Sequence, residues 1–238
     1  MCGRYRIKDT DVLTRHLRDT FHIPDWVPDQ TFPHYNIAPS YDLPVLTMDE
    51  EGDVIVPSFM RWGFVPFWDK SDRPKLAPIN AKSEGIVTNA LFRRAVQQRR
   101  CLVPADGFYE WLRYDEKTKF PFDIHLRGNR PFVMAGVYEK ATETRPATFA
   151  ILTTGPNAVM QRIHDRMPAI LDDEEARAWL RPGELTPEAV AGLTAPHPAE
   201  DMEATPISSL VNSPRNDVPE ILTPVAPPPP KQTQPELF

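Results

Sequence analysis

Cys2 has the most distinctive chemistry in this sequence, because a small residue after the initiator methionine usually lets an aminopeptidase remove Met1. Removal leaves a free amine and a thiol on one residue, with pKa values of about 8 and about 8.5. The amine condenses with an aldehyde to a Schiff base, and the thiol closes that imine to a five-membered thiazolidine. The position therefore predicts reaction with an aldehyde, or with an acyl group as second choice, unless a cysteine stands there by chance.

Glu110 lies within the aromatic run Gly107-Phe108-Tyr109-Glu110-Trp111. Aromatic neighbours exclude water and raise the pKa of a carboxyl group, which suits a general acid or base. Strand alternation puts Glu110 on the same face as Phe108, which disfavours exposure. An outward-facing strand residue is the alternative.

Two further segments bring an amide, cations, an imidazole and carboxylates close together in the sequence. They are Pro78-Ile79-Asn80-Ala81-Lys82-Ser83-Glu84 and Ile163-His164-Asp165-Arg166-Met167-Pro168. The first is a short extended segment, and the second ends at a proline. A structural histidine beside a surface ion pair is the alternative for the second. The aromatic residues between Trp62 and Trp68 could stack on bases, although such clusters are more often core.

Charge is unevenly distributed along the 238 residues. The chain has 27 Lys and Arg against 33 Asp and Glu, a net charge of -6, which at first argues against a nucleic-acid partner. Residues 1–170, however, hold 23 basic and 21 acidic residues, and residues 73–100 hold seven basic residues against Glu84 alone. Because the local field steers a ligand, DNA stays compatible with this chain, while a solvated basic helix face is the plainer interpretation of the cluster.

The composition excludes several classes of protein. Hydrophobic residues make up 41% and aromatic residues 10%, which excludes a wholly disordered chain. No apolar run approaches about 18 residues, so we expect no membrane span, and the polar N-terminus is no secretory signal. The two cysteines, Cys2 and Cys101, cannot build a disulfide framework or a cysteine zinc site. We expect a cytoplasmic protein with no metal and no cofactor, with Cys101 as a buried structural thiol.

Hydrophobic patterning predicts many short strands and few short helices. The expected strands are 44–46, 54–60, 101–104, 108–112, 120–126, 132–137, 147–153 and 204–207. The expected helices are 9–20, 88–100, 157–162, 172–180 with Asp172 as N-cap, and 186–192. A turn at Asp106-Gly107 predicts a hairpin between 101–104 and 108–112. This mixture indicates an α+β fold with a mostly antiparallel, barrel-like sheet and short flanking helices.

The last residues differ in character from the rest. We divide the chain into a catalytic domain, residues 1–222, and a flexible proline-rich tail, residues 223–238. The tail ends in Gln234-Pro235-Glu236-Leu237-Phe238, which resembles the peptides by which bacterial replication and repair proteins dock on the sliding clamp. Leu237 and Phe238 would fill an apolar pocket and Gln234 would bond at its rim, unless this short motif arises by chance.

Six segments together resemble the SRAP family, the SOS response-associated peptidase domain proteins, which crosslink to abasic sites in single-stranded DNA. They are Met1-Cys2-Gly3-Arg4-Tyr5, Tyr35-Asn36-Ile37-Ala38-Pro39, Arg61-Trp62-Gly63, Asn80-Ala81-Lys82-Ser83-Glu84, Cys101-Leu102-Val103-Pro104-Ala105-Asp106-Gly107-Phe108-Tyr109-Glu110-Trp111 and Ile163-His164-Asp165-Arg166-Met167-Pro168. The resemblance covers residues 2–216 and implies the SRAP α+β fold around a barrel-like sheet.

The resemblance implies roles for ten residues. Cys2 would form the thiazolidine, Asn80 would orient the sugar, Glu110 would shuttle protons, and His164 would assist the Schiff-base and strand-cleaving steps. The implied DNA contacts are Arg4, Lys82 and Arg166 to phosphates and Pro39, Trp62 and Trp68 around the kinked strand. Relatives commonly have Arg at the position of Lys82, and lysine keeps the charge but loses bidentate geometry.

We therefore expect an abasic-site sensor and processing enzyme of the DNA damage (SOS) response. It would crosslink covalently to single-stranded DNA, with a lyase activity and autocatalytic Met1 removal beside it. We expect a monomer in the nucleoid. The alternatives are an N-terminal-nucleophile cysteine peptidase and a non-catalytic single-strand DNA-binding adaptor on the sliding clamp.

Overall fold

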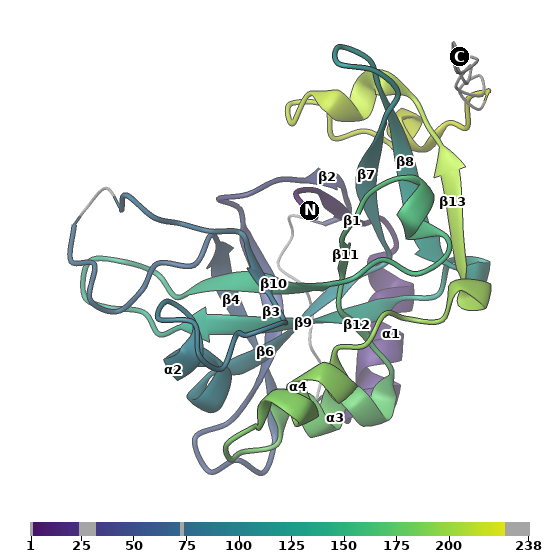
Figure 1. Cartoon of the computed structure of the whole chain (residues 1–238). Coiled ribbons are helices and arrows are strands. Elements are labelled where there is room, and N and C mark those ends of the chain that lie inside the picture. The colour runs from purple at the N-terminus through teal and green to yellow at the C-terminus, as the bar shows by residue number, and fades with distance from the viewer. Residues whose placement is uncertain (1, 24–31, 72–73, 227–238) are drawn as a thin grey trace, which may run out of the picture.

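Two sheets and four short α-helices make up the protein in a computed structural model that describes residues 2–23, 32–71 and 74–226. Figure 1 shows the two sheets, one toward the upper right of the view and the other across its centre and left. The mixture confirms the predicted α+β class.

The first sheet has the strand order β13-β8-β7-β1-β2 and is antiparallel throughout. Its strands are β1 (Tyr5–Ile7), β2 (His34–Ile37), β7 (Gly107–Arg113), β8 (Lys119–Leu126) and β13 (Met202–Pro206). The strands β1 and β2 lie in segments without a predicted strand. They are short and depend on partners distant in sequence, so local patterning gives little sign of them.

The second sheet closes on itself. Its strands are β3 (Asp42–Met48), β4 (Ile55–Trp62), β5 (Asn80–Lys82), β6 (Arg100–Ala105), β9 (Phe132–Glu139), β10 (Thr148–Thr154), β11 (Met167–Pro168) and β12 (Ile170–Leu171). The path from β10 through β4, β3, β6 and β9 returns to β10, because β9 also pairs with β10. This ring matches the predicted barrel-like sheet. Among the strand pairings of the described residues, those of β10 with β4 and β5 are parallel and the others are antiparallel.

Four α-helices flank the sheets. They are α1 (Thr10–Phe21), α2 (Arg93–Gln98), α3 (Asp173–Leu180) and α4 (Pro187–Leu193). The predicted cap is present, since Asp172 accepts from the Glu175 N–H and the Glu175 side chain bonds back to the Asp172 N–H. The predicted helix at 157–162 is only a single 3-10 turn, Met160–Arg162.

The predicted helix 88–100 is too long at both ends. Side-chain bonds in its first turn favour turns over helix, because Thr88 Oγ1 donates to the Gly85 carbonyl and Asn89 Oδ1 accepts from the Leu91 N–H. At the other end, Arg100 already belongs to β6. The helix α2 therefore covers only Arg93–Gln98.

The predicted hairpin at Asp106-Gly107 is wrong. The strand β6 pairs with β3 and β9, whereas β7 pairs with β1 and β8, so this turn passes the chain from one sheet to the other. Asp106 is buried and accepts from the Arg6 guanidinium and from the Lys8 and Asp9 N–H groups. Hydrogen bonds to residues distant in sequence therefore determine the course of the chain here, whereas the Asp-Gly pair alone suggested a hairpin turn.

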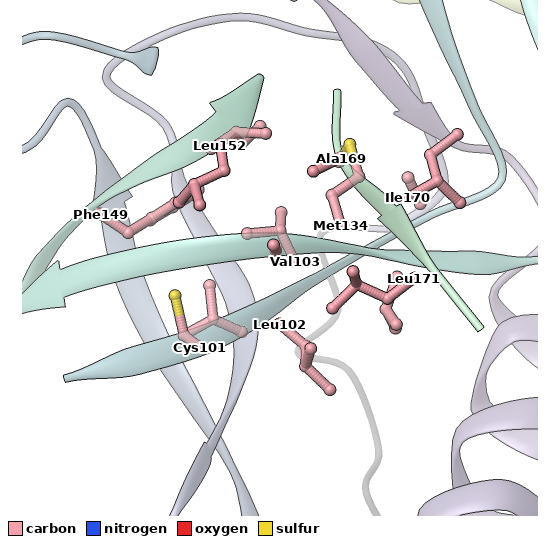
Figure 2. Packing of buried hydrophobic residues seen from close by; sticks show 14 of the residues in the cluster. Cys101, Leu102, Val103, Met134, Phe149, Leu152, Ala169, Ile170 and Leu171 are labelled. Carbon is pink, nitrogen blue, oxygen red and sulfur yellow. The ribbon is translucent and has the colours of Figure 1, made fainter. Parts of the chain in front are cut away.

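One hydrophobic core joins both sheets. Figure 2 shows part of it, with Cys101 and Val103 from β6, Met134 from β9 and Leu152 from β10. Cys101 is a free, fully buried thiol, as predicted. A Cβ on Gly136 would lie 2.7 Å from its Sγ, so this core is closely packed.

The folded part of the protein continues slightly past residue 222, the predicted end of the domain. The Val225 N–H donates to the Pro206 carbonyl, and Ile207 bridges to Pro224. Within residues 2–23, 32–71 and 74–226, no helix is long and apolar enough to cross a bilayer. Gln234, Leu237 and Phe238 lie outside the described residues.

Candidate active site

The first sheet brings Cys2 beside Glu110. In the antiparallel pairing of β1 with β7, Tyr5 lies opposite Phe108, and the Tyr109 N–H donates to the Arg4 carbonyl. Continuing this antiparallel course, the residues before Tyr5 run along β7 toward Glu110. Both Cys2, at 0% exposure, and Glu110, at 3% exposure, are buried, which agrees with the predicted inward face of Glu110.

The second sheet brings Asn80 to Cys2. Asn80 begins β5, which pairs in parallel with β10. Its Nδ2 donates to the Cys2 carbonyl at 2.9 Å, across 78 residues of sequence. This bond joins the N-terminal segment of one sheet to an edge strand of the other, so the two sheets together form the site.

His164 comes from the opposite edge of β10, because Thr153 pairs with Lys82 of β5 on one edge and with Pro168 of β11 on the other. It lies just before β11, which pairs with the end of β10 through Met167 and Thr154. Its Nδ1 accepts from the Arg166 N–H at 3.0 Å and lies 2.9 Å from Asp165 Oδ1.

A cavity of about 330 Å³ contains Glu110 and His164 together. Its other lining residues are Trp111, Arg113, Lys119, Ile163 and Asn212. Sequence reasoning did not select Arg113, Lys119 or Asn212 for the site. The two cations flank a turn and lie opposite each other in the pairing of β7 with β8. Asn212 lies far away in sequence and joins this wall by accepting from Trp111 Nε1. A larger cavity of about 610 Å³, beside the β3–β4 turn, contains no predicted site residue.

Burial dominates the electrostatics of Cys2. It raises the pKa of the thiol well above its ordinary value, and the Glu110 carboxylate raises that pKa further. At neutral pH the sulfur is therefore a thiol, S–H. Reaction through sulfur requires a base to take this proton, and Glu110 is near enough to influence it.

Arg4 is tied to the protein. Its Nη1 donates to Asn36 Oδ1 at 2.8 Å and to the Val211 carbonyl at 2.9 Å. The Asn36 amide in turn donates to the Ser213 and Asn216 carbonyls. Arg4 thus anchors the chain just after Cys2, and this anchoring role is an addition to the predicted phosphate contact.

Arg166 and Lys82 differ in their surroundings. Arg166 donates from both Nη atoms to the carboxylate of Glu84, at 2.8 and 2.7 Å, rather than pairing with Asp165. Lys82 is exposed at the end of β5. A phosphate contact by Arg166 would therefore share or replace the bonds to Glu84, whereas Lys82 is open to solvent.

The predicted aromatic contacts divide into core and surface. Trp62 is 1% exposed, its Nε1 donates to the Ile79 carbonyl, and its ring packs on Tyr5 and Phe149. Direct stacking of Trp62 on DNA does not fit this burial, because no ring face is free. Trp68 is 50% exposed. Pro39 is half-buried in the turn after β2.

A buried ionic cluster behind the site escaped sequence reasoning. Arg6 is fully buried and donates to both carboxylate oxygens of Asp123 and to Asp106. A Cβ on Gly107 would lie 2.5 Å from the Arg6 guanidinium carbon, so the glycine leaves room for this cluster. The cluster holds β1 against β7 and β8, and thereby the segment that leads to Cys2.

The described residues bring a carboxylate and an imidazole to one cavity, and the carboxylate lies next to the nucleophile Cys2, which the Asn80 amide holds through its carbonyl. In residues 2–23, 32–71 and 74–226, no group of three His, Cys, Asp or Glu side chains is arranged to hold a metal ion. This set of groups suits attack on a carbonyl carbon with proton transfer by side chains.

Comparisons with known proteins agree with these motifs. A family model described as SOS response associated peptidase (SRAP) matches residues 1–214. The abasic site processing protein YoqW of Bacillus subtilis is 40% identical over an alignment of 228 residues that covers 93% of this chain and 99% of that protein. The abasic site processing protein HMCES of Mus musculus is 33% identical over 272 residues, covering 94% of this chain and 76% of that protein.

Solved structures share the fold. A protein from Bacteroides thetaiotaomicron has a TM-score of 0.77 and 27% identity, covering 94% of this chain and all of that one. A phage-related protein from Bordetella bronchiseptica has a TM-score of 0.69 and 27% identity, covering 87% of this chain and 95% of that one.

Proposed function

Since this chain belongs to the SRAP family, we propose that it processes abasic sites by forming a covalent thiazolidine between Cys2 and the abasic aldehyde in single-stranded DNA. The relatives named above carry abasic site processing in their names. The description of the family model also supports a role in the SOS response. Removal of Met1 is required first, because only a free Cys2 amine can form the ring.

The reaction balances with groups of this chain alone. The Cys2 amine attacks the aldehyde carbon of the ring-opened sugar, and loss of water gives the imine. The Cys2 sulfur then adds to the imine carbon, and the thiol proton is transferred to the imine nitrogen. Glu110 moves protons in these steps, because the thiol is held protonated by burial and needs a base. Asn80 holds the Cys2 backbone, and His164 assists imine formation and its reversal.

One observation carries this proposal. The 2.9 Å bond from Asn80 to the Cys2 carbonyl joins residues that are 78 positions apart in sequence. Around it, Glu110 and His164 line one cavity. A cysteine at position 2 by chance gives no reason for an amide to hold it and for a carboxylate to lie beside it at a cavity that also contains an imidazole.

Incubation with an abasic oligonucleotide tests the proposal. We expect a heat-stable band shift on a denaturing gel with the mature protein, and no such band with Cys2→Ala. An undamaged oligonucleotide is the control for both proteins, and we expect Cys2→Ala to bind it with nearly unchanged affinity. A stable adduct on Cys2→Ala, or no adduct on the mature wild-type protein, would contradict the proposal.

The sequence of the tail supports a second part of the proposal, a sliding clamp as partner. The motif consists of Gln234, Leu237 and Phe238 behind a run of prolines. A tether of this kind would increase the effective concentration of the protein at the replication fork.

A further inference from the structure

We propose that Arg113 and Lys119 form a subsite for the phosphodiester groups on one side of the abasic site. The inference rests on the proposed function, because it extends the same cavity along the DNA strand. The reaction centre lies at Cys2, and the subsite would hold the strand that leaves it over β7 and β8.

Cross-strand pairing sets two positive charges face to face. In the register of β7 with β8, Arg113 lies directly opposite Lys119, so both side chains project from the same face of the sheet. Like charges in this arrangement destabilise a sheet. Both residues are exposed. An anion between them would remove this cost.

The two cations belong to the cavity of the candidate active site. They line it together with Glu110 and His164, so an anion held by them would lie next to the reacting groups. Asp115 and Glu116 of the adjoining turn do not line the cavity, and Asp115 Oδ1 accepts from the Lys117 and Thr118 N–H groups. Glu110 is the acidic side chain among the residues that line the cavity, so Arg113 and Lys119 supply two positive charges there.

The wall beside the two cations is held in place. Trp111 Nε1 donates to Asn212 Oδ1 at 2.7 Å, and both residues line the cavity. Trp111 also packs against the small apolar cluster that includes Tyr109 and Val211. Two cations beside a half-buried indole suit a nucleotide with its phosphate, because the phosphate accepts from the cations and the indole offers an apolar face.

Binding to undamaged single-stranded DNA gives the first test. In the double variant Arg113→Gln/Lys119→Gln we expect affinity to fall by about tenfold or more, since two charge-assisted bonds are lost. The slope of log affinity against log salt should decrease by roughly 1.4, at about 0.7 per phosphate contact. The matched control is Arg15→Gln/Lys117→Gln, which removes the same charges at exposed positions outside the cavity.

The second test asks on which side of the abasic site the flanking phosphates must lie. Two short oligonucleotides are compared, with the abasic site at the 5′ end or at the 3′ end, so that flanking phosphates lie on one side only. The double variant should lose apparent affinity in crosslinking for one of the two, and the control double variant for neither. Equal loss for both, or no loss beyond that of the control, overturns the subsite.

The two proposals fail separately. If the wild-type protein gives no adduct, the proposed crosslinking function fails, and the subsite is then decided by the affinity and salt slope for undamaged DNA. If the wild-type protein gives an adduct and the double variant behaves as the control does, the subsite alone fails.

Discussion

At the scale of single residues, Glu110 is the group whose removal should affect chemistry most selectively. It is buried, lines the cavity with His164 and raises the pKa of the Cys2 thiol. In Glu110→Gln, we expect adduct formation to slow by roughly 10²–10⁴-fold, as for loss of a general acid or base, because the amide fills the same space but cannot take a proton. Single-turnover rates with an abasic oligonucleotide measure this.

Glu116→Gln is the matched control for that variant, since Glu116 is an exposed carboxylate in the β7–β8 turn. It should react at the wild-type rate. The affinity of Glu110→Gln for undamaged single strands should stay close to that of the wild-type protein. If Glu110→Gln forms the adduct as fast as the wild-type protein, Glu110 has no part in proton transfer.

The buried cysteine thiols and tyrosine hydroxyls predict that the stability of the fold decreases at alkaline pH. Burial raises the pKa of the Cys2 and Cys101 thiols and of the Tyr5 and Tyr109 hydroxyls. Above the ordinary thiol pKa, about 9, the unfolded chain releases protons that the folded protein keeps. The unfolded state then binds fewer protons, so the free energy of unfolding decreases as pH rises, by up to about 1.4 kcal/mol per pH unit for each group.

Urea denaturation at a series of pH values from about 8 upward measures this decrease. Cys101→Ala removes one of the titrating thiols, so its decrease should be less steep than that of the wild-type protein. A free energy of unfolding that stays constant through this range would show that these groups titrate normally in the folded protein.

At the scale of elements, the turn from β6 to β7 depends on Gly107. An alanine there would put its Cβ 2.5 Å from the guanidinium carbon of Arg6, which is bonded to Asp106 and Asp123. Disturbing a buried ion pair costs about 3–5 kcal/mol, so we expect Gly107→Ala to lower the free energy of unfolding by about 3 kcal/mol or more. Chemical denaturation followed by circular dichroism measures it.

Gly192→Ala is the control for this effect. Gly192 lies in α4, and a Cβ there meets nothing within 4 Å. Because alanine favours helix over glycine, this variant should be as stable as the wild-type protein or up to about 1 kcal/mol more stable. Equal stability of the two variants would contradict the role assigned to the buried cluster.

Local signals in the sequence predicted most of these elements. The apolar spacing of α1, the capping residue of α3 and the alternating or continuous apolar runs of β8, β9 and β10 all act within a few residues. The strands β1 and β5 have three residues each and are stabilised by distant partners. Because long-range pairing decides them, patterning over a short window cannot find them.

The candidate site, too, combines residues that local motifs identify with features that depend on the whole fold. Motifs selected Cys2, Asn80, Glu110 and His164, and the structure brings Asn80 to Cys2 and Glu110 to His164. The family resemblance placed Trp62 on the DNA, whereas the alternative raised from the sequence, that such aromatic clusters are more often core, holds for this residue.

At the scale of the whole molecule, the cationic stretch at 73–100 is only partly available to DNA. Arg99 pairs with Glu139, and Arg100 donates to backbone carbonyls that include those of Val96 and Trp179. Both are buried, so they stabilise the fold rather than attract a ligand. The exposed cations beside the site, Lys82 among them, are the ones that can contribute to binding, and this modest number suits the covalent attachment to DNA that we propose.

The sequence of the tail leads to a prediction about the whole protein at the replication fork. Deletion of 234–238 should abolish capture of the bacterial sliding clamp in a pull-down, because Leu237 and Phe238 supply the apolar anchors and Gln234 the polar one. Thr233→Ala, which leaves the motif intact, is the control and should bind the clamp as the wild-type protein does. The deletion should leave crosslinking to a free abasic oligonucleotide unchanged, since the packed body reaches Val225 without these residues. Unchanged clamp capture by the truncated protein would eliminate the clamp as a partner of this motif.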